Sequence, residues 1–280
     1  MKTCISCILR VSRHLKGDFN CKICCFNGVL KGYFTIFTAM NKKFPKVLLC
    51  APQHISKMYC WEQWYERITS LTYPNYDIFI ADNSKTVDNT DYINSFEGVE
   101  AVWTKDKGNG LLAHINDSHK QCAEQTLKGG YDFMFHLETD VFPPLDVIER
   151  LLVHKRPIIG GMYDIYFGKK RKAMIQMKEG YERTLKGYNV VKFLEEGEPL
   201  FYDGTVREVF HAGLGCMLIH RDILHGVKFR VEKGVNFHTD TWFANDCFLY
   251  NKDIYVDTTI MCKHYNQTWL DNLEKLNEHV

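Results

Sequence analysis

The chain has 280 residues, of which 45% are hydrophobic and 25% are charged, and its formal net charge is +1. These values are ordinary for a soluble globular protein of one or two domains, and the balanced charge argues against a protein that coats nucleic acid. No apolar run approaches the roughly 20 residues that a membrane-spanning helix needs. Charged residues also interrupt the N-terminal segment where a signal peptide would be apolar, so we expect a cytoplasmic protein.

The N-terminal segment is rich in cysteine, with five of the chain's 11 cysteines in the first 25 residues. Cys4 and Cys7, and then Cys21 and Cys24, form two pairs with the spacing of a zinc knuckle, although the gap between the pairs is slightly short. A structural Zn²⁺ and a leader with reduced thiols both remain open. Because the pattern of a folded domain begins just after Met40, we expect an extension over 1–39 and one domain over 40–280.

The domain begins with a strand, a helix and a second strand. The apolar run 46–50 predicts a buried strand, aromatic and aliphatic residues over 61–71 recur at helical spacing, and 76–81 is again a strand. This order implies a right-handed crossover in a parallel α/β sheet. Polar or turn-forming residues follow each strand. They are Pro52 after the first, and Asp82 and Asn83 after the second.

A third strand is expected over 99–103, followed by a helix over 111–128 that ends at a glycine pair. His114 and His119 lie on this helix without partners at the spacing of metal ligands. We expect both to be partly exposed helix residues.

The next strand, over 133–137, is nearly all apolar and ends in Glu138 and Asp140. In an extended segment, residues two apart project to the same side, so both carboxylates would face one point. Ligands bind at the carboxyl ends of strands in open α/β sheets. Two carboxylates there suit a hard divalent cation that also touches phosphate oxygens.

Glycine and basic residues mark the segment that follows. A short strand over 156–163 contains Gly160 and Gly161, where a substrate could approach the backbone closely. The four cations of 169–172 could contact a diphosphate or a nucleic acid, or form a solvated loop. The segment 178–206 is expected to be β-rich.

Near the C-terminal end, Gly213 and Gly215 precede a buried strand that runs to residue 219, and Asp240 opens a helix that continues to Tyr250. Asp240 sits where a helix N-cap would, and Asp246 is a second acidic residue within the same helix. A last strand over 253–258 is followed by His264, and the tail 269–280 has leucines at helical spacing.

Taken in this order, the motifs over about 45–266 resemble the GT-A-fold glycosyltransferases, in a form similar to the family-2-like branch. Glu138 and Asp140 match the acidic Asp-x-Asp motif that holds Mn²⁺ or Mg²⁺ on the diphosphate of a nucleotide-sugar, with Glu as a departure at the first position. The resemblance implies that Asp82 contacts the nucleoside, which competes with an Asx-turn at the same residue.

The resemblance also implies roles near the acceptor. Asp240 matches the catalytic general base, with Thr239 in place of the preceding acid, and His264 resembles the third metal ligand. Gly215 belongs to a glycine-rich segment like the one that lines the acceptor and sugar pocket. Pro52, Asn83 and Gly161 complete the expected donor pocket.

The sequence therefore predicts an α/β protein of GT-A fold that acts as an inverting, metal-dependent, hexosyltransferase-like enzyme with a UDP-sugar donor. The acceptor hydroxyl belongs to a glycan, a small molecule or, as in some phage enzymes, a hydroxymethylated pyrimidine in DNA. Two other interpretations are a nucleotidyltransferase and a non-catalytic protein that binds nucleotides or sugars. The first would carry a glycine-rich phosphate loop after the first strand, and 51–54 is not one.

Overall fold

A computed structural model describes residues 44–167, 170–177, 182–183, 189–190, 193–195, 203–235 and 237–265. The extension 1–39 with the proposed zinc ligands Cys4, Cys7, Cys21 and Cys24, the first cation of 169–172 and the tail 269–280 lie outside the described residues.

Most strands are short, as expected for an α/β domain. They are β1 (Val47–Gln53), β2 (Tyr76–Asp82), β3 (Val99–Trp103), β4 (Phe133–Leu137), β5 (Val141–Phe142), β6 (Ile158–Phe167), β7 (Lys170–Gln176), β8 (Glu182–Arg183), β9 (Asn189–Val190), β10 (Phe193–Glu195), β11 (Val206–Val209), β12 (His211–Ala212), β13 (Cys216–His220) and β14 (Ile254–His264).

The helices alternate with the strands in the first half of the domain. They are a 3₁₀ helix η1 (Ile55–Cys60) and the α-helices α3 (Trp61–Thr69), α4 (Asp88–Asn94), α5 (Leu111–Lys128), α6 (Val147–Val153), α7 (Arg221–Gly226) and α8 (Thr239–Leu249). The expected strands and helices in this half are confirmed to within a few residues, and β8 to β10 fall in the segment predicted to be β-rich.

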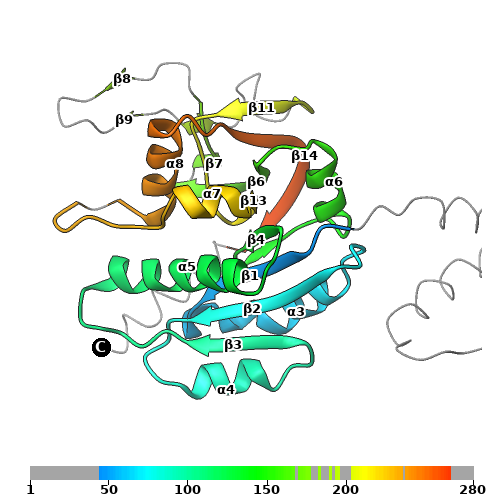
Figure 1. The fold of residues 1–280 in the computed structure, drawn as a ribbon, viewed down its shortest axis with the longest axis vertical. Helices are drawn as coiled ribbons and strands as arrows, with labels where there is room; N and C mark the ends of the chain where they lie inside the picture. Colours follow the sequence, from blue (N-terminus) through cyan, green and yellow to red (C-terminus); the bar gives the residue numbers. More distant parts are fainter. Residues whose placement is uncertain are drawn as a thin grey trace, which may run out of the picture. The chain divides into compact units, whose positions relative to one another are not determined.

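The main sheet has the strand order β10-β7-β6-β13-β4-β1-β2-β3 (Figure 1). The β3-β2-β1-β4 half is parallel throughout. β13 then pairs antiparallel with both β4 and β6, and β14 lies parallel to β6. The parallel half therefore presents the carboxyl ends of β1, β2 and β4 at one edge, where the polar residues of the sequence motifs gather.

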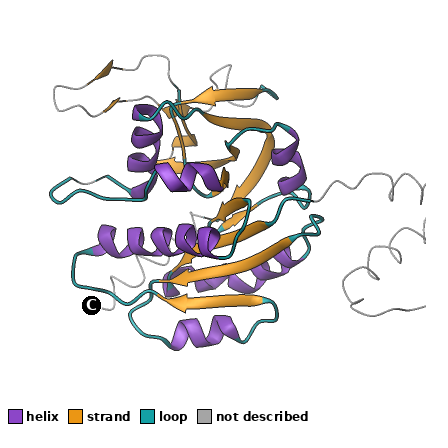
Figure 2. Cartoon of the chain, viewed as in Figure 1, coloured by secondary structure: helices purple, strands orange, loops and turns teal. Residues whose placement is uncertain are grey.

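Helices cover both faces of the sheet (Figure 2). Alternate residues of β1 explain this arrangement, because successive strand side chains point to opposite faces. Val47 and Leu49 pack in one cluster with Trp61 of α3. Leu48 packs in the other cluster with Cys122 of α5. The sheet is thus buried between two apolar layers, as its nearly continuous apolar strands predict.

Among the described residues, no helix has the length and apolarity needed to cross a membrane.

Candidate metal and donor site

The acidic pair lies in a tight turn at the carboxyl end of β4. The amide of Val141 donates to the carbonyl oxygen of Glu138 at 3.0 Å, so 138–141 is a turn and not the extended segment that we expected. The side chain of Thr139 points inward and donates to Gln53, while the carboxylates of Glu138 and Asp140 still converge on one point. The convergence is therefore confirmed, but the turn produces it.

His264 reaches this point because β14 folds back over the turn. His264 pairs with Val141 across the β14–β5 ladder, and its Nδ1 lies 2.7 Å from the carbonyl oxygen of Asp164. A carbonyl only accepts, so Nδ1 carries a proton, and Nε2 is the ring nitrogen that can meet a metal when the ring is neutral. Nε2 faces Asp140 Oδ2 at 3.6 Å.

One ligand atom from each of Glu138, Asp140 and His264 can be chosen so that all lie within 4.8 Å of one another. Two carboxylate oxygens and one imidazole nitrogen form a donor set that Mn²⁺ accepts. Burial alone would raise the pKa of Asp140, but Lys57 and His264 outweigh it and hold the pKa well below its usual range. Asp140 is thus present as a carboxylate, the form that binds a cation. The three residues together fit a divalent metal.

Lys57 contacts the same two carboxylates. Its Nζ lies 3.2 Å from Oε2 of Glu138 and 3.0 Å from Oδ1 of Asp140. Burial would lower the pKa of Lys57, but these two acids raise it above its ordinary value. Nothing in the sequence spacing indicated this partner, since 81 residues separate Lys57 from Glu138.

Asp240 stands on the first turn of α8, one residue inside the helix. The N-cap is His238, which makes no side-chain cap hydrogen bond, so the predicted N-cap position of Asp240 is wrong. Its Oδ1 accepts from the amide of Thr241 at 2.7 Å, and its Oδ2 lies 3.5 Å from Nε2 of the buried His211. Burial would raise the pKa of Asp240, but His211 and His238 hold it below its usual value.

The phenol of Tyr163 is buried beside His264. Burial raises its pKa well above the ordinary value, with further contributions from Glu138 and Asp240. Its ring meets that of His264 edge to face, with centroids 5.2 Å apart. Tyr163 is thus buried beside His264, one of the three candidate metal ligands.

Tyr163 also explains the glycine at 215. The amide of Gly215 donates to the Tyr163 hydroxyl at 3.1 Å, and a Cβ on Gly215 would lie 2.6 Å from Cζ of that ring. A Cβ on Gly161 would lie 2.6 Å from Cγ2 of Ile260. At both positions the space beside the backbone is filled by the protein itself, so internal packing requires these glycines.

At the end of β2, Asp82 and Asn83 differ in what they contact. Asp82 is fully buried, and its carboxylate accepts from the amide and hydroxyl of Ser84 and from the hydroxyl of Thr90. The structure shows the Asx-turn, and the contact of Asp82 with a nucleoside stays a prediction. The side-chain oxygen of Asn83 is buried without a hydrogen-bond partner. Pro52, opposite Ala81 in the ladder, is half-buried beside this edge.

Two histidines near the site form a buried stacked pair that the sequence did not indicate. Nδ1 of His119 lies 2.9 Å from Nε2 of His136, and Nδ1 of His136 lies 2.7 Å from the carbonyl oxygen of Leu214. Burial lowers the pKa of both rings. The expectation that His119 is partly exposed is wrong, because α5 packs that face onto β4. His114 is half-buried and contacts the carbonyl oxygen of Thr104.

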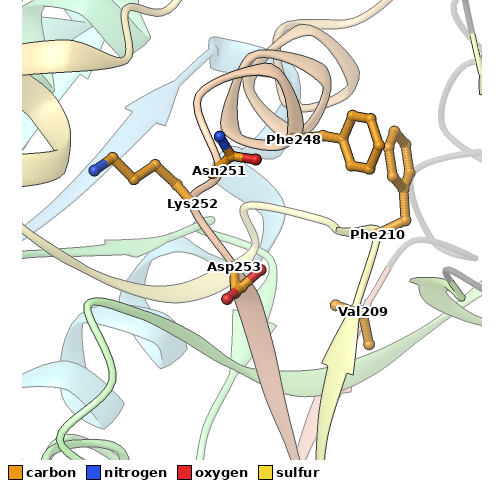
Figure 3. Close-up of a pocket in the computed structure, with 6 residues that line it drawn as sticks. All are labelled: Val209, Phe210, Phe248, Asn251, Lys252 and Asp253. Carbon is orange, nitrogen blue, oxygen red and sulfur yellow. The ribbon is translucent and has the colours of Figure 1, made fainter.

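A separate hollow of about 310 Å³ lies where β11 and β12 meet the end of α8 (Figure 3). It is lined by Val209, Phe210, Phe248, Asn251, Lys252 and Asp253. The rings of Phe210 and Phe248 form one side, with centroids 5.8 Å apart. None of these residues belongs to the acidic site.

No family model and no curated protein sequence matches the chain. Many solved structures resemble it, and three of them are the following. GalNAc-T7 with UDP, GalNAc and Mn²⁺ has a TM-score of 0.54 at 11% identity, covering 80% of this chain and 44% of its own. TarS 1–349 from S. aureus has a TM-score of 0.46 at 12% identity, covering 77% of this chain and 60% of its own. A197 from STIV has a TM-score of 0.41 at 13% identity, covering 79% of this chain and 85% of its own.

The chain thus spans less than two thirds of GalNAc-T7 and of TarS, and at these identities the likeness concerns the fold. Of the three, GalNAc-T7 has a TM-score above 0.5. The predicted GT-A fold is confirmed, with a central sheet between two helical layers.

Proposed function

We propose that the protein is a divalent-metal-dependent glycosyltransferase that moves a sugar from a UDP-sugar to an acceptor hydroxyl with inversion. The observation that carries the proposal is the convergence of Glu138, Asp140 and His264 at the carboxyl end of β4 in a GT-A fold. In that fold the edge formed by β1, β2 and β4 is where a ligand binds. GalNAc-T7, which shares the fold, was solved with UDP and Mn²⁺.

Three residues would hold the metal. Asp140 and Glu138 supply carboxylate oxygens, and His264 supplies Nε2, since Asp164 fixes the proton on the other ring nitrogen. When bound, a divalent ion neutralises charge on the leaving nucleoside diphosphate. The nucleoside would lie across the ends of β1 and β2, beside Pro52 and the unpartnered oxygen of Asn83.

Asp240 would act on the acceptor. The acceptor oxygen bonds to the anomeric carbon while the bond from that carbon to the diphosphate breaks, and the hydroxyl proton moves to the Asp240 carboxylate. His211 and the amide of Thr241 hold this carboxylate in place. His211 and His238 hold the pKa of Asp240 below its usual value, so the carboxylate is ionised and able to accept a proton.

The test is a screen of nucleotide-sugars for Mn²⁺-dependent release of the nucleoside diphosphate, with EDTA as the control for metal. We expect UDP release from at least one UDP-sugar, and we expect Asp140→Ala to abolish it while the protein stays folded. If no nucleotide-sugar is hydrolysed and none raises the melting temperature in the presence of Mn²⁺, the proposal is wrong. Adding glycans, small alcohols and hydroxymethylated DNA to the active donor then identifies the acceptor class.

A further inference from the structure

The side-chain amine of Lys57 contacts both carboxylates that a metal would use. Nζ lies 3.0 Å from Oδ1 of Asp140 and 3.2 Å from Oε2 of Glu138. A divalent ion bound to Glu138 and Asp140 would lie about 2.0–2.6 Å from the carboxylate oxygens that hold it. The ammonium and the metal ion repel each other at this range, and both draw on the same two carboxylates. Lys57 and the metal are therefore alternative occupants.

The backbone that carries Lys57 is well anchored. His54 caps η1 by accepting from the amide of Ser56, and the amide of Lys57 donates to the carbonyl oxygen of His54 at 2.8 Å. Cys60, at the other end of η1, lies with its thiol 3.3 Å from the carbonyl oxygen of Thr139, which ties η1 to the acidic turn. The backbone of Lys57 is therefore fixed beside the two carboxylates. Its amine can move only by rotation about the side-chain bonds.

The Lys57 side chain also has room to leave. It is 24% exposed, whereas that of Asp140 is 4% exposed. The acid is enclosed and the lysine faces the open side of the site. Rotation about the bonds of the four-carbon lysine side chain allows the ammonium to move several ångströms while its Cα stays in place.

We propose that Lys57 and the divalent metal exchange at the Glu138–Asp140 pair, and that the displaced ammonium pairs with the diphosphate of the donor. This inference rests on the proposed function. Without metal, the two carboxylates and Lys57 sum to one negative charge. With a divalent ion they become neutral without Lys57, whose positive charge then faces the diphosphate. When metal and donor are both bound, the metal neutralises the two carboxylates and the Lys57 ammonium faces the diphosphate. With the metal alone, the displaced ammonium has no anion to pair with.

Lys57 consequently sets how strongly metal binding depends on the nucleotide. The metal alone must displace an ammonium that has no other anion to contact, so its affinity is low. When the diphosphate is present, the ammonium gains a new partner and the metal affinity rises. By linkage, the metal raises the affinity for the nucleotide by the same factor.

The experiment measures Mn²⁺ binding from the electron paramagnetic resonance signal of free Mn²⁺, with no nucleotide present. Lys57→Met removes the competing ammonium, and we expect this variant to bind Mn²⁺ roughly tenfold more tightly than the wild type. A tenfold change corresponds to a small part of the Coulomb energy between two charges at this distance. Lys57→Arg keeps the charge and replaces the point charge by a fork that suits carboxylates, so it should bind Mn²⁺ more weakly than the wild type. Lys85→Met, which removes an exposed cation near the same sheet edge, should match the wild type.

Equal or weaker Mn²⁺ binding by Lys57→Met overturns the exchange. If Lys57→Met does not fold, Lys57→Gln, which also removes the ammonium, is used in its place, and equal or weaker Mn²⁺ binding by Lys57→Gln overturns the exchange. Repeating the titration with saturating UDP should raise Mn²⁺ affinity more in the wild type than in Lys57→Met. If UDP binds none of the proteins, the proposed function fails, while the comparison with Mn²⁺ alone still decides the exchange.

Discussion

Arg230 donates two hydrogen bonds to the carboxylate of Asp246, from Nε to Oδ2 at 2.6 Å and from Nη2 to Oδ1 at 2.8 Å. The guanidinium also lies 4.1 Å from the centre of the Trp242 ring. The planar guanidinium thus binds the carboxylate through two parallel hydrogen bonds. This ion pair holds the segment before α8 against the helix. Asp246 is thereby engaged within the protein, whereas Asp240 keeps an 18% exposed side chain.

This difference gives opposite predictions for two Asp→Asn changes on α8. Asp240→Asn keeps an oxygen for the amide of Thr241 but removes the proton acceptor, so transfer should fall by about 10²–10⁴-fold. Its melting temperature and UDP affinity should stay near wild type. Asp246→Asn breaks the charged pair with Arg230 and should cost about 1–3 kcal/mol of stability, with transfer by the folded fraction preserved. Steady-state kinetics and urea denaturation check both, and exchanged behaviours would make Asp246 the base.

The metal assignment predicts a specific loss at Asp140. Asp140→Asn removes the negative charge from the most enclosed ligand, so Mn²⁺ should no longer strengthen UDP binding in isothermal titration calorimetry. Asp146→Asn, in a more exposed acid at the start of α6, is the matched control and should leave the effect of Mn²⁺ intact. Retention of the Mn²⁺ effect in Asp140→Asn would move the metal to other residues.

Asp82 and Asn83, at the end of β2, are expected to differ in role: Asp82 stabilises the fold, and Asn83 is a candidate contact for the donor. Asn83→Ala removes a buried oxygen that has no partner, so stability should hold while UDP affinity falls by roughly tenfold, the value of one hydrogen bond. Asp82→Ala leaves Ser84 and Thr90 without their acceptor and should cost about 1–3 kcal/mol of stability. Calorimetry with UDP and urea denaturation distinguish the two. An unchanged UDP affinity in Asn83→Ala would remove this residue from the donor pocket.

The contact between Gly215 and Tyr163 predicts a packing defect. Gly215→Ala would place a methyl group against the phenol ring, and overpacking of this kind costs about 1–3 kcal/mol. Gly226→Ala, where nothing lies within 4 Å of the new Cβ, is the control and should be neutral or slightly stabilising. Thermal denaturation measures both. A neutral Gly215→Ala would mean that the Tyr163 ring moves aside freely.

The stacked histidines predict a pH dependence of stability. Both have a folded-state pKa below the ordinary 6.5, so below pH 6.5 the unfolded chain binds more protons than the folded one. Their contribution is therefore fully present above pH 6.5 and is lost as the pH falls, by up to about 1.4 kcal/mol per pH unit for each ring.

Urea denaturation between pH 5 and pH 8 checks this, with His119→Gln as the informative variant. Gln can still donate to Nε2 of His136 but does not titrate, so the loss of stability below pH 6.5 should be shallower than in the wild type. His225→Gln replaces an exposed histidine and serves as the control. The same slope in His119→Gln and wild type would contradict the buried neutral pair.

The sequence by itself determined most of the strands and helices in the first half of the domain and the position of the acidic pair. Apolar periodicity is a local property, so β3 was predicted at 99–103 as observed, and Glu138 and Asp140 were placed at the end of a buried strand. The Asx-turn at Asp82 was also a local alternative, because its partner Ser84 is two residues away.

Only the tertiary structure decided what those residues contact. Lys57 meets Asp140 from 83 positions away, Tyr163 requires the glycine at 215, and His136 is the buried partner of His119. These contacts follow from the pairing of β1 with β4, from the packing of α5 on β4 and from the placement of β13 between β4 and β6. Periodicity records which face of an element is buried but not which element covers it. The charge and packing of the site therefore arise from strand order, which local spacing does not encode.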